Sequence, residues 1–120
     1  DIEKAANEGN RNAKDALDMF VASVVKYISQ YYTELDCHID GIVFTAGIGE
    51  NASKFRELVV SELSQTIGAK LDEEQNDKIA GFKEIHEGMI SRADAKCNLF
   101  VVPTNEELVI ARDTYRILGF

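Results

Sequence analysis

The residues best suited to bind a ligand form a glycine-rich turn at positions 45–51, with the sequence Thr-Ala-Gly-Ile-Gly-Glu-Asn. Gly47 and Gly49 would let an anion approach the backbone, because neither residue carries a Cβ. The turn lies between a predicted strand and a helix predicted to begin near Asn51. A helix N-terminus presents unpaired N–H groups and about half a positive charge, so the pattern indicates a phosphate-binding turn that needs no basic side chain.

The glycine pattern by itself leaves other interpretations. A Walker A loop is excluded because the turn does not end in Gly-Lys-Ser or Gly-Lys-Thr. Gly47, Gly49 and Ala52 match the G-x-G-x-x-A pattern of dinucleotide-binding folds, but residues 69–72 make a poor second strand, which disfavours that fold. A tight strand-to-helix turn that binds nothing remains open on the glycines alone.

The charge balance limits which ligands could bind. The chain has 13 Lys and Arg against 21 Asp and Glu, a formal net charge of −8. This charge would repel nucleic acid, and an anionic nucleotide would have to be held by backbone donors, a helix end or a metal ion.

The sequence also bears on cellular location. The apolar runs fall far short of the ~20 residues needed to span a bilayer, so no membrane partner is expected. The charged start without an initiator Met is no signal peptide, and it suggests a piece of a longer protein or a processed product. Cys37 and Cys97 are isolated, which fits a reducing cytosol, and both are expected to be buried thiols.

Two helices and a strand are predicted around the glycine turn. The first helix covers residues 12–32 after a turn or cap at Gly9 and Asn10, and residues 39–45, rich in β-branched side chains, predict a buried strand. The apolar stripe of that helix consists of Leu17, Phe20, Val21, Val24, Ile28 and Tyr31. The second helix ends at Gly68. Its predicted buried face consists of Phe55, Leu58, Val59 and Leu63.

The second half of the chain continues the alternation of segments. Residues 72–83 are polar and predicted to be irregular with at most one helical turn, residues 88–91 predict a short strand, 92–96 a turn, and 97–102 an apolar strand. Alternating strands and helices predict an α/β layer with partly parallel strands. A sheet of so few strands is not stable by itself. We therefore expect either that missing parts of the chain supply further strands or that the segment docks on a partner.

The last predicted helix has the clearest start signal. Thr104 and Glu107 are three residues apart and predict a capping box with Thr104 as the cap. The apolar stripe of this helix consists of Leu108, Ala111, Tyr115 and Leu118.

Residues 43–51 and 102–108, in this order and at this separation, closely resemble the acetate kinase family, and the resemblance covers essentially the whole chain. It implies an α/β, actin-like (ribonuclease H-like) ATPase domain segment, with layered helices on a mixed sheet. Residues 1–120 would be the C-terminal nucleotide-binding and dimerisation segment. Members of the family are cytoplasmic homodimers that transfer the γ-phosphoryl group of ATP to acetate with Mg²⁺, giving acetyl phosphate and ADP.

The resemblance also assigns roles to residues. The family's nucleotide loop matches Gly47, Ile48, Gly49, Glu50 and Asn51. Ile48 would pack near the base or ribose, and Asn51 would cap the helix or donate to the nucleotide. Glu50 is expected to belong to the loop without contacting the phosphates directly, because they would repel its carboxylate unless it turns away or reaches metal-bound water. Glu106 matches the magnesium position, although an acid in a first helical turn also stabilises the helix dipole with no ligand.

The catalytic and acetate-binding functions of the family are expected to lie outside this chain, and activities other than acetate transfer remain as alternatives. The resemblance places no catalytic residue in this segment and the acetate site elsewhere, so the segment alone is expected to be inactive. Arg56, Arg92 and Arg112 are predicted to be solvated, and His38 and His86 to be surface or packing residues. Propionate or butyrate kinase, and a non-catalytic dimerisation module, remain the alternatives.

Overall fold

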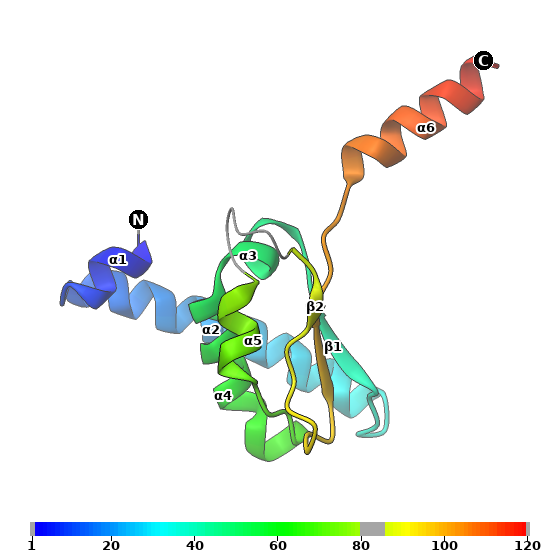
Figure 1. Cartoon of the computed structure of the whole chain (residues 1–120). Helices are drawn as coiled ribbons and strands as arrows, with labels where there is room; N and C mark the ends of the chain where they lie inside the picture. The colour runs from blue at the N-terminus through cyan, green and yellow to red at the C-terminus, as the bar shows by residue number, and fades with distance from the viewer. Residues whose placement is uncertain (1, 80–85, 120) are drawn as a thin grey trace.

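Helices pack on one face of a small sheet in the computed structural model, which describes residues 2–79 and 86–119 (Figure 1). The elements follow in the order α1 (Ile2–Asn7), α2 (Arg11–Glu34), β1 (Gly41–Phe44), α3 (Ala46–Asn51), α4 (Ser53–Ile67), α5 (Glu73–Lys78), β2 (Gly88–Met89), β3 (Asn98–Val101) and α6 (Glu106–Leu118). In the part of the chain that the structure describes, no helix is both long and apolar enough to cross a membrane.

The sheet has three strands in the order β1-β3-β2. β1 pairs with β3 in parallel, with Phe44 opposite Val101, and β2 pairs with β3 antiparallel, with Met89 opposite Phe100. The side chains of Leu99 and Val101 point to the helices and have no exposed surface. The predicted α/β layer with partly parallel strands is therefore confirmed. The prediction that the first strand is buried is wrong for Val43 of β1, which is 55% exposed.

Among the described residues, helix α4 supplies more of the core than any other element, because its apolar residues recur at helical spacing. The predicted residues Phe55, Val59 and Leu63 are buried, and Leu58 is half-buried. The helix ends at Gly68, which has a φ of 73° and lies in the left-handed region that favours glycine. The predicted stop at Gly68 is confirmed.

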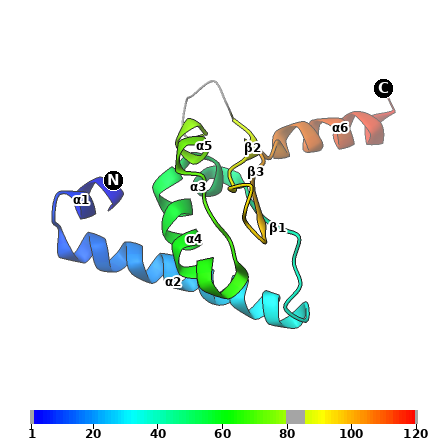
Figure 2. The ribbon, with the colours of Figure 1, turned by 60° about the horizontal axis from the view of Figure 1, so that its bottom comes forward.

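Helix α2 lies across α4, as the second view shows (Figure 2). It begins after Asn10, whose side chain accepts a hydrogen bond from Ala13 N at 3.1 Å, so the predicted cap is confirmed. Val21 is buried, but Phe20 and Tyr31 are 41% and 58% exposed, which corrects the predicted stripe. Phe20 nevertheless stacks on Phe55 of α4, with ring centroids 5.0 Å apart.

Two helices extend beyond the predicted elements. Residues 2–7 form α1 where no helix was predicted, and α5, with six residues, forms in the stretch predicted to contain at most one helical turn. Asp72 caps α5 by accepting from Gln75 N at 3.0 Å. The prediction for positions 80–83 lies outside the described residues.

The start of α6 differs from the predicted capping box. Asn105 is the N-cap, and its Oδ1 accepts from Leu108 N at 2.9 Å. Thr104 is not the cap, because its hydroxyl and N–H donate to Glu50 instead. Among residues Glu106–Leu118, all of them described, none is buried, so the predicted stripe faces solvent.

Candidate functional site

The two sequence motifs meet at one edge of the sheet. β1 and β3 are parallel neighbours, so their carboxyl ends lie together, and one motif follows each strand. Val102 N donates to Phe44 O at 3.0 Å, which keeps the two chain segments side by side just beyond the strands. Ligands of α/β sheets bind at the carboxyl ends of parallel strands.

The glycine motif is itself a short helix, α3, and not a loop ahead of a helix beginning near Asn51. Ala46, its first residue, has a φ of 58°, in the left-handed region that a non-glycine residue rarely adopts. Such backbone conformations occur more often at functional sites. The long helix α4 begins only at Ser53, so its N-terminus is not at the glycines.

The two glycines serve different purposes. A Cβ on Gly47 would meet nothing within 4 Å, so packing does not demand a glycine there. A Cβ on Gly49 would lie 3.1 Å from the carbonyl carbon of Phe44, and Gly49 is buried. Gly49 thus lets α3 pack on the end of β1, while Gly47 leaves its backbone open to a ligand.

Glu50 joins the two motifs. Its Oε1 accepts a hydrogen bond from Thr104 N at 2.9 Å and from Thr104 Oγ1 at 3.3 Å. The carboxylate is therefore directed to the segment between β3 and α6. Asn51 was predicted to cap the helix or to donate to the nucleotide. It does not cap α4, whose N-cap is Ala52, and its Nδ2 instead donates to Gly47 O at 2.8 Å, inside α3.

A hollow of about 400 Å³ lies between the motifs. Its lining consists of Ala46, Gly47, Glu50, Thr104, Asn105, Glu106 and Glu107. Of the residues predicted to form the site, the structure thus brings Gly47, Glu50 and Glu106 together. Ile48 is 51% exposed outside this lining, and Gly49 and Asn51 support α3.

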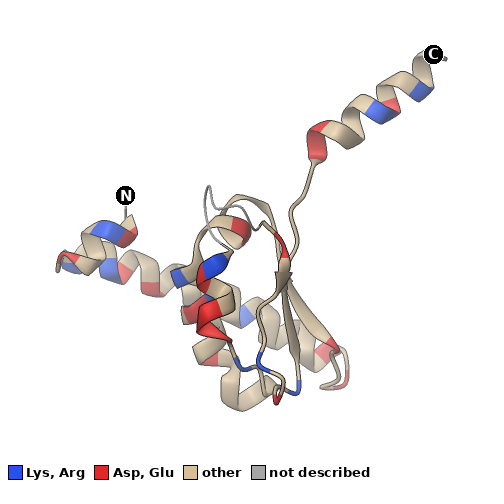
Figure 3. Ribbon diagram, in the orientation of Figure 1, with Lys and Arg blue, Asp and Glu red and all other residues tan. Residues whose placement is uncertain are grey.

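The lining of the hollow is acidic. Glu106 and Glu107 form the first turn of α6, shown at the start of that helix in Figure 3. Mg²⁺ typically takes one or two carboxylates together with water and phosphate oxygens, so this donor set fits a phosphate-bound magnesium ion. Within residues 2–79 and 86–119, no group of three or more His, Cys, Asp and Glu could hold a metal ion by itself.

Arg56 contacts α3, and the sequence prediction placed it wrongly. It was predicted to be solvated, but its exposed fraction is 0%. Nη1 donates to Gly49 O at 2.8 Å and to Glu50 O at 2.9 Å. Burial lowers the pKa of the guanidinium, and nearby Asp77 partly opposes this effect. Helical spacing could have predicted the burial of Arg56, because positions 56, 59, 60, 63 and 67 form one buried stripe on α4.

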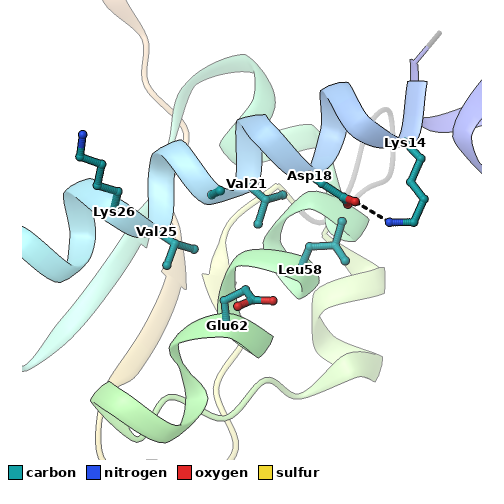
Figure 4. A pocket seen from close by; sticks show the side chains of 8 residues that line it. Lys14, Asp18, Val21, Val25, Lys26, Leu58 and Glu62 are labelled. Atoms are coloured by element: carbon teal, nitrogen blue, oxygen red, sulfur yellow. Dashed lines mark hydrogen bonds and ion pairs between the residues drawn. The ribbon is translucent and has the colours of Figure 1, made fainter. Parts of the chain in front are cut away.

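A larger hollow, of about 590 Å³, lies between α2 and α4. Figure 4 shows Val21, Val25 and Leu58 between the two helices, with Lys14 and Asp18 hydrogen-bonded to each other. The lining consists of Lys14, Asp18, Val21, Ala22, Val25, Lys26, Leu58 and Glu62. None of these residues belongs to the two sequence motifs.

Comparison with known proteins agrees with the two motifs. The sequence pattern of the Acetokinase family matches residues 1–112. The acetate kinase of Heliobacterium modesticaldum is 50% identical over 118 residues, which cover 98% of this chain and 28% of that protein. The acetate kinase of Methanosarcina thermophila is 48% identical, with 98% and 27% covered. The chain therefore spans little more than a quarter of the length of these relatives.

Solved structures of similar proteins have the same arrangement of elements. The acetate kinase of Porphyromonas gingivalis matches with a TM-score of 0.80 and 36% identity, over 98% of this chain and 28% of that one. A propionate kinase from Francisella tularensis matches with a TM-score of 0.79 and 32% identity, over 93% and 27%. The acetate kinase of Entamoeba histolytica, at 23% identity and a TM-score of 0.82 over 99% and 30%, shares the fold.

Proposed function

The chain belongs to the acetokinase family, and from this we propose that it is the C-terminal nucleotide-binding and dimerisation segment of an acetate kinase. The mixed α/β layer agrees with the actin-like ATPase fold expected for this family. The proposed reaction transfers the γ-phosphoryl group of ATP to acetate and gives acetyl phosphate and ADP. ATP and ADP would bind in the hollow between α3 and α6.

One observation carries the proposal: the glycine motif and the Glu106 motif, 59 positions apart at Gly47 and Glu106, line one hollow at the carboxyl ends of parallel strands. The exposed backbone at Gly47 would approach the phosphates, since a Cβ there would meet open space. Ile48 would pack near the base or ribose. Glu50 and Asn51 would hold the two motifs in place through Thr104 and the Gly47 carbonyl.

The acidic lining explains why a divalent cation is part of the proposal. Phosphates beside Glu106 and Glu107 would be repelled in the absence of a counter-charge. Mg²⁺ bound by Glu106 would neutralise charge on the phosphates, as in other phosphoryl-transfer enzymes. The role of Glu106 is to hold that charge at the mouth of the hollow.

The remaining parts of the proposal concern the longer protein. The groups that catalyse transfer and bind acetate would lie outside this chain, since in-line transfer needs charge neutralisation on both sides of the phosphate. The isolated segment would then be inactive. The full-length protein would be a cytoplasmic homodimer.

The nucleotide site is tested first at Gly47 in the full-length protein. Gly47→Val adds a side chain whose Cβ would meet nothing within 4 Å, at a residue that lines the hollow, so thermal stability should change little. We expect the KM for ATP to rise about tenfold or more, the factor that ~1.4 kcal/mol of lost binding produces. An unchanged KM for ATP would remove α3 from the nucleotide site.

Gly49→Ala is the contrasting variant. Its new Cβ would meet the backbone of Phe44, so we expect a loss of about 1–3 kcal/mol in the free energy of unfolding. A lower melting temperature in Gly49→Ala and not in Gly47→Val would separate packing from ligand approach.

The magnesium role is tested with two adjacent acids. Glu106→Gln should raise the Mg²⁺ concentration needed for half-maximal activity by about tenfold or more, while Glu107→Gln, in the same helical turn, should shift it far less. Equal shifts in both variants would indicate a general effect of negative charge on the hollow. That result would contradict a specific role for Glu106.

The substrate is tested by acyl-hydroxamate formation with ATP, Mg²⁺ and acetate, propionate or butyrate. Preference for acetate would support acetate kinase. Preference for propionate is the second candidate, favoured by the similarity to the Francisella propionate kinase. No turnover of any of the three by a folded full-length protein would favour the non-catalytic dimerisation module.

A further inference from the structure

We propose that Arg56 is a positioning residue for the nucleotide site, holding the ends of α3 and α5 together so that α3 keeps its place against β1. The inference rests on the proposed function, because α3 carries the backbone expected to approach the phosphates. Arg56 itself lies outside the hollow and is fully buried, so it acts through α3 and touches no substrate.

The carbonyl groups at the end of α3 need hydrogen-bond donors from outside that helix. The last carbonyls of a helix have no partner inside the helix. Ile48 O accepts from Ala52 N at 3.0 Å, but Gly49 O and Glu50 O accept from Nη1 of Arg56. A side chain from α4 therefore completes the hydrogen bonding of α3.

The same guanidinium completes the end of α5. Its Nη2 donates to Asn76 O at 2.9 Å and to Ile79 O, and its Nε donates to Asn76 Oδ1 at 2.7 Å. Asn76 is 2% exposed, and its Nδ2 donates to Ser53 O at 3.0 Å, at the start of α4. Arg56 and Asn76 thus connect α3, α4 and α5 through buried hydrogen bonds.

Two helix ends favour the charge of Arg56, in addition to nearby Asp77. All five acceptors of the guanidinium are uncharged oxygens, and four of them are backbone carbonyls at or near the ends of α3 and α5. The C-terminal end of a helix carries about half a negative charge, so two such ends favour a cation between them. Arg suits this place better than Lys, because its planar fork directs donors to several acceptors at once.

The consequence reaches the hollow through Glu50. Its backbone carbonyl is held by Arg56, and its carboxylate is held to Thr104 N at 2.9 Å, two residues before Glu106. α3 has only six residues and would not be stable as an isolated helix. Without Arg56, α3 would therefore lose its fixed place between β1 and Thr104.

The test is Arg56→Lys in the full-length protein, with Mg-ADP affinity measured by titration calorimetry. Loss of several charge-assisted hydrogen bonds should raise the Kd for Mg-ADP by about tenfold or more, with the KM for acetate within about twofold. Hydrogen exchange should be faster at the amides of Ala46–Asn51 and unchanged in the second half of α4.

Leu63→Ala is the matched control, on the same helix and also buried. It should lower the melting temperature at least as much as Arg56→Lys and leave the Kd for Mg-ADP within about twofold. A Kd for Mg-ADP in Arg56→Lys equal to that of Leu63→Ala would overturn the inference, because Arg56 would then contribute to stability alone.

Asn76→Ala tests the positioning role of Arg56 if the Arg56→Lys protein does not fold. It removes the acceptor of Nε and leaves the carbonyl acceptors, so the Kd for Mg-ADP should rise by about threefold or more. An unchanged Kd in a folded Asn76→Ala protein would overturn the inference. Failure of the unmodified protein to bind Mg-ADP would instead contradict the proposed function.

Discussion

At the scale of single residues, the two cysteines have opposite environments. Cys97 is 1% exposed, immediately before β3, and burial raises the pKa of its thiol. Cys37 is exposed, with a φ of 60° in the turn after α2, so the prediction that both thiols are buried is wrong for Cys37. The difference arises because β3 is covered by α4 and the turn after α2 is not.

Alkylation should separate the two cysteines. In the folded chain at pH 8, iodoacetamide should modify Cys37 and leave Cys97 unmodified, since the thiolate reacts and Cys97 is both covered and less acidic. Mass spectrometry of digested protein measures both sites, and urea should make Cys97 reactive. Equal modification of both cysteines in the folded state would contradict the buried position of Cys97.

The raised pKa of Cys97 also predicts a pH dependence of stability. Above the ordinary thiol pKa of 9.0, Cys97 loses its proton in the unfolded chain before it does so in the folded chain. Its contribution to stability is therefore complete below pH 9.0 and is lost as the pH rises through the folded-state pKa. Urea unfolding at pH 8 and pH 10 should show this decline, and Cys97→Ala should reduce it while Cys37→Ala should not.

At the scale of elements, the helices differ in what stabilises them. α4 has a buried face and a glycine stop, whereas α3 and α5 have six residues each and depend on Arg56 and Asn76. α6 has thirteen residues, and Leu108, Tyr115 and Leu118 of its predicted stripe are 42%, 61% and 63% exposed. A helix of that length is marginal without tertiary packing.

Hydrogen exchange of the isolated chain should therefore distinguish α6 from α4. Amides of Val109–Tyr115 should exchange with little protection, while those of Val59 to Leu63 should show the protection of the core. Mass-spectrometric or NMR detection resolves the two helices. Protection of α6 equal to that of α4 would show that α6 packs on the body of the isolated chain.

At the scale of the whole molecule, the chain has more surface than a compact monomer of its size. Its accessible surface is 8597 Å² and its mass 13.3 kDa, for which about 6,500 Å² is expected. The radius of gyration is 16.7 Å, against roughly 14 Å for 120 residues, in keeping with the projecting α6 (Figure 1). Accessible surface this far above the expected value is typical of a segment that packs against further polypeptide, in the same protein or in a partner.

The side of the sheet that no helix covers contributes to this additional accessible surface. Val43, Phe100 and Met89 are paired in one row across the three strands, and Val43 and Met89 are 55% and 52% exposed. Leu99 and Val101, on the opposite side, are fully buried. A contiguous apolar row on an open sheet favours association.

The isolated chain should accordingly self-associate, and Val43→Lys should weaken that association without lowering the melting temperature. Light scattering coupled to size-exclusion chromatography measures the mass over a range of concentrations. Gln65→Lys, on the exposed surface of α4, adds the same charge elsewhere and is the control. Equal effects of the two variants would point to net charge and not to the open sheet.

The sequence by itself determined the features that depend on local pattern. Helical spacing of apolar residues predicted α2 and α4, a run rich in β-branched residues predicted β1, an apolar run predicted β3, and Gly68 predicted the end of α4. These signals are reliable because periodicity and the left-handed preference of glycine act within a few residues of the chain. The two motifs that resemble the acetate kinase family are likewise readable without a structure.

Only the tertiary structure decided which surfaces those elements bury and which residues meet. The stripe of α6 is apolar but exposed, because burial depends on what lies opposite a helix. Thr104 binds Glu50 and does not cap α6, and Arg56 lies inside the protein because two distant helix ends supply its acceptors. α3 forms at the glycines although a six-residue helix does not persist on its own. Each of these outcomes depends on contacts between segments far apart in the chain, which local propensity does not encode.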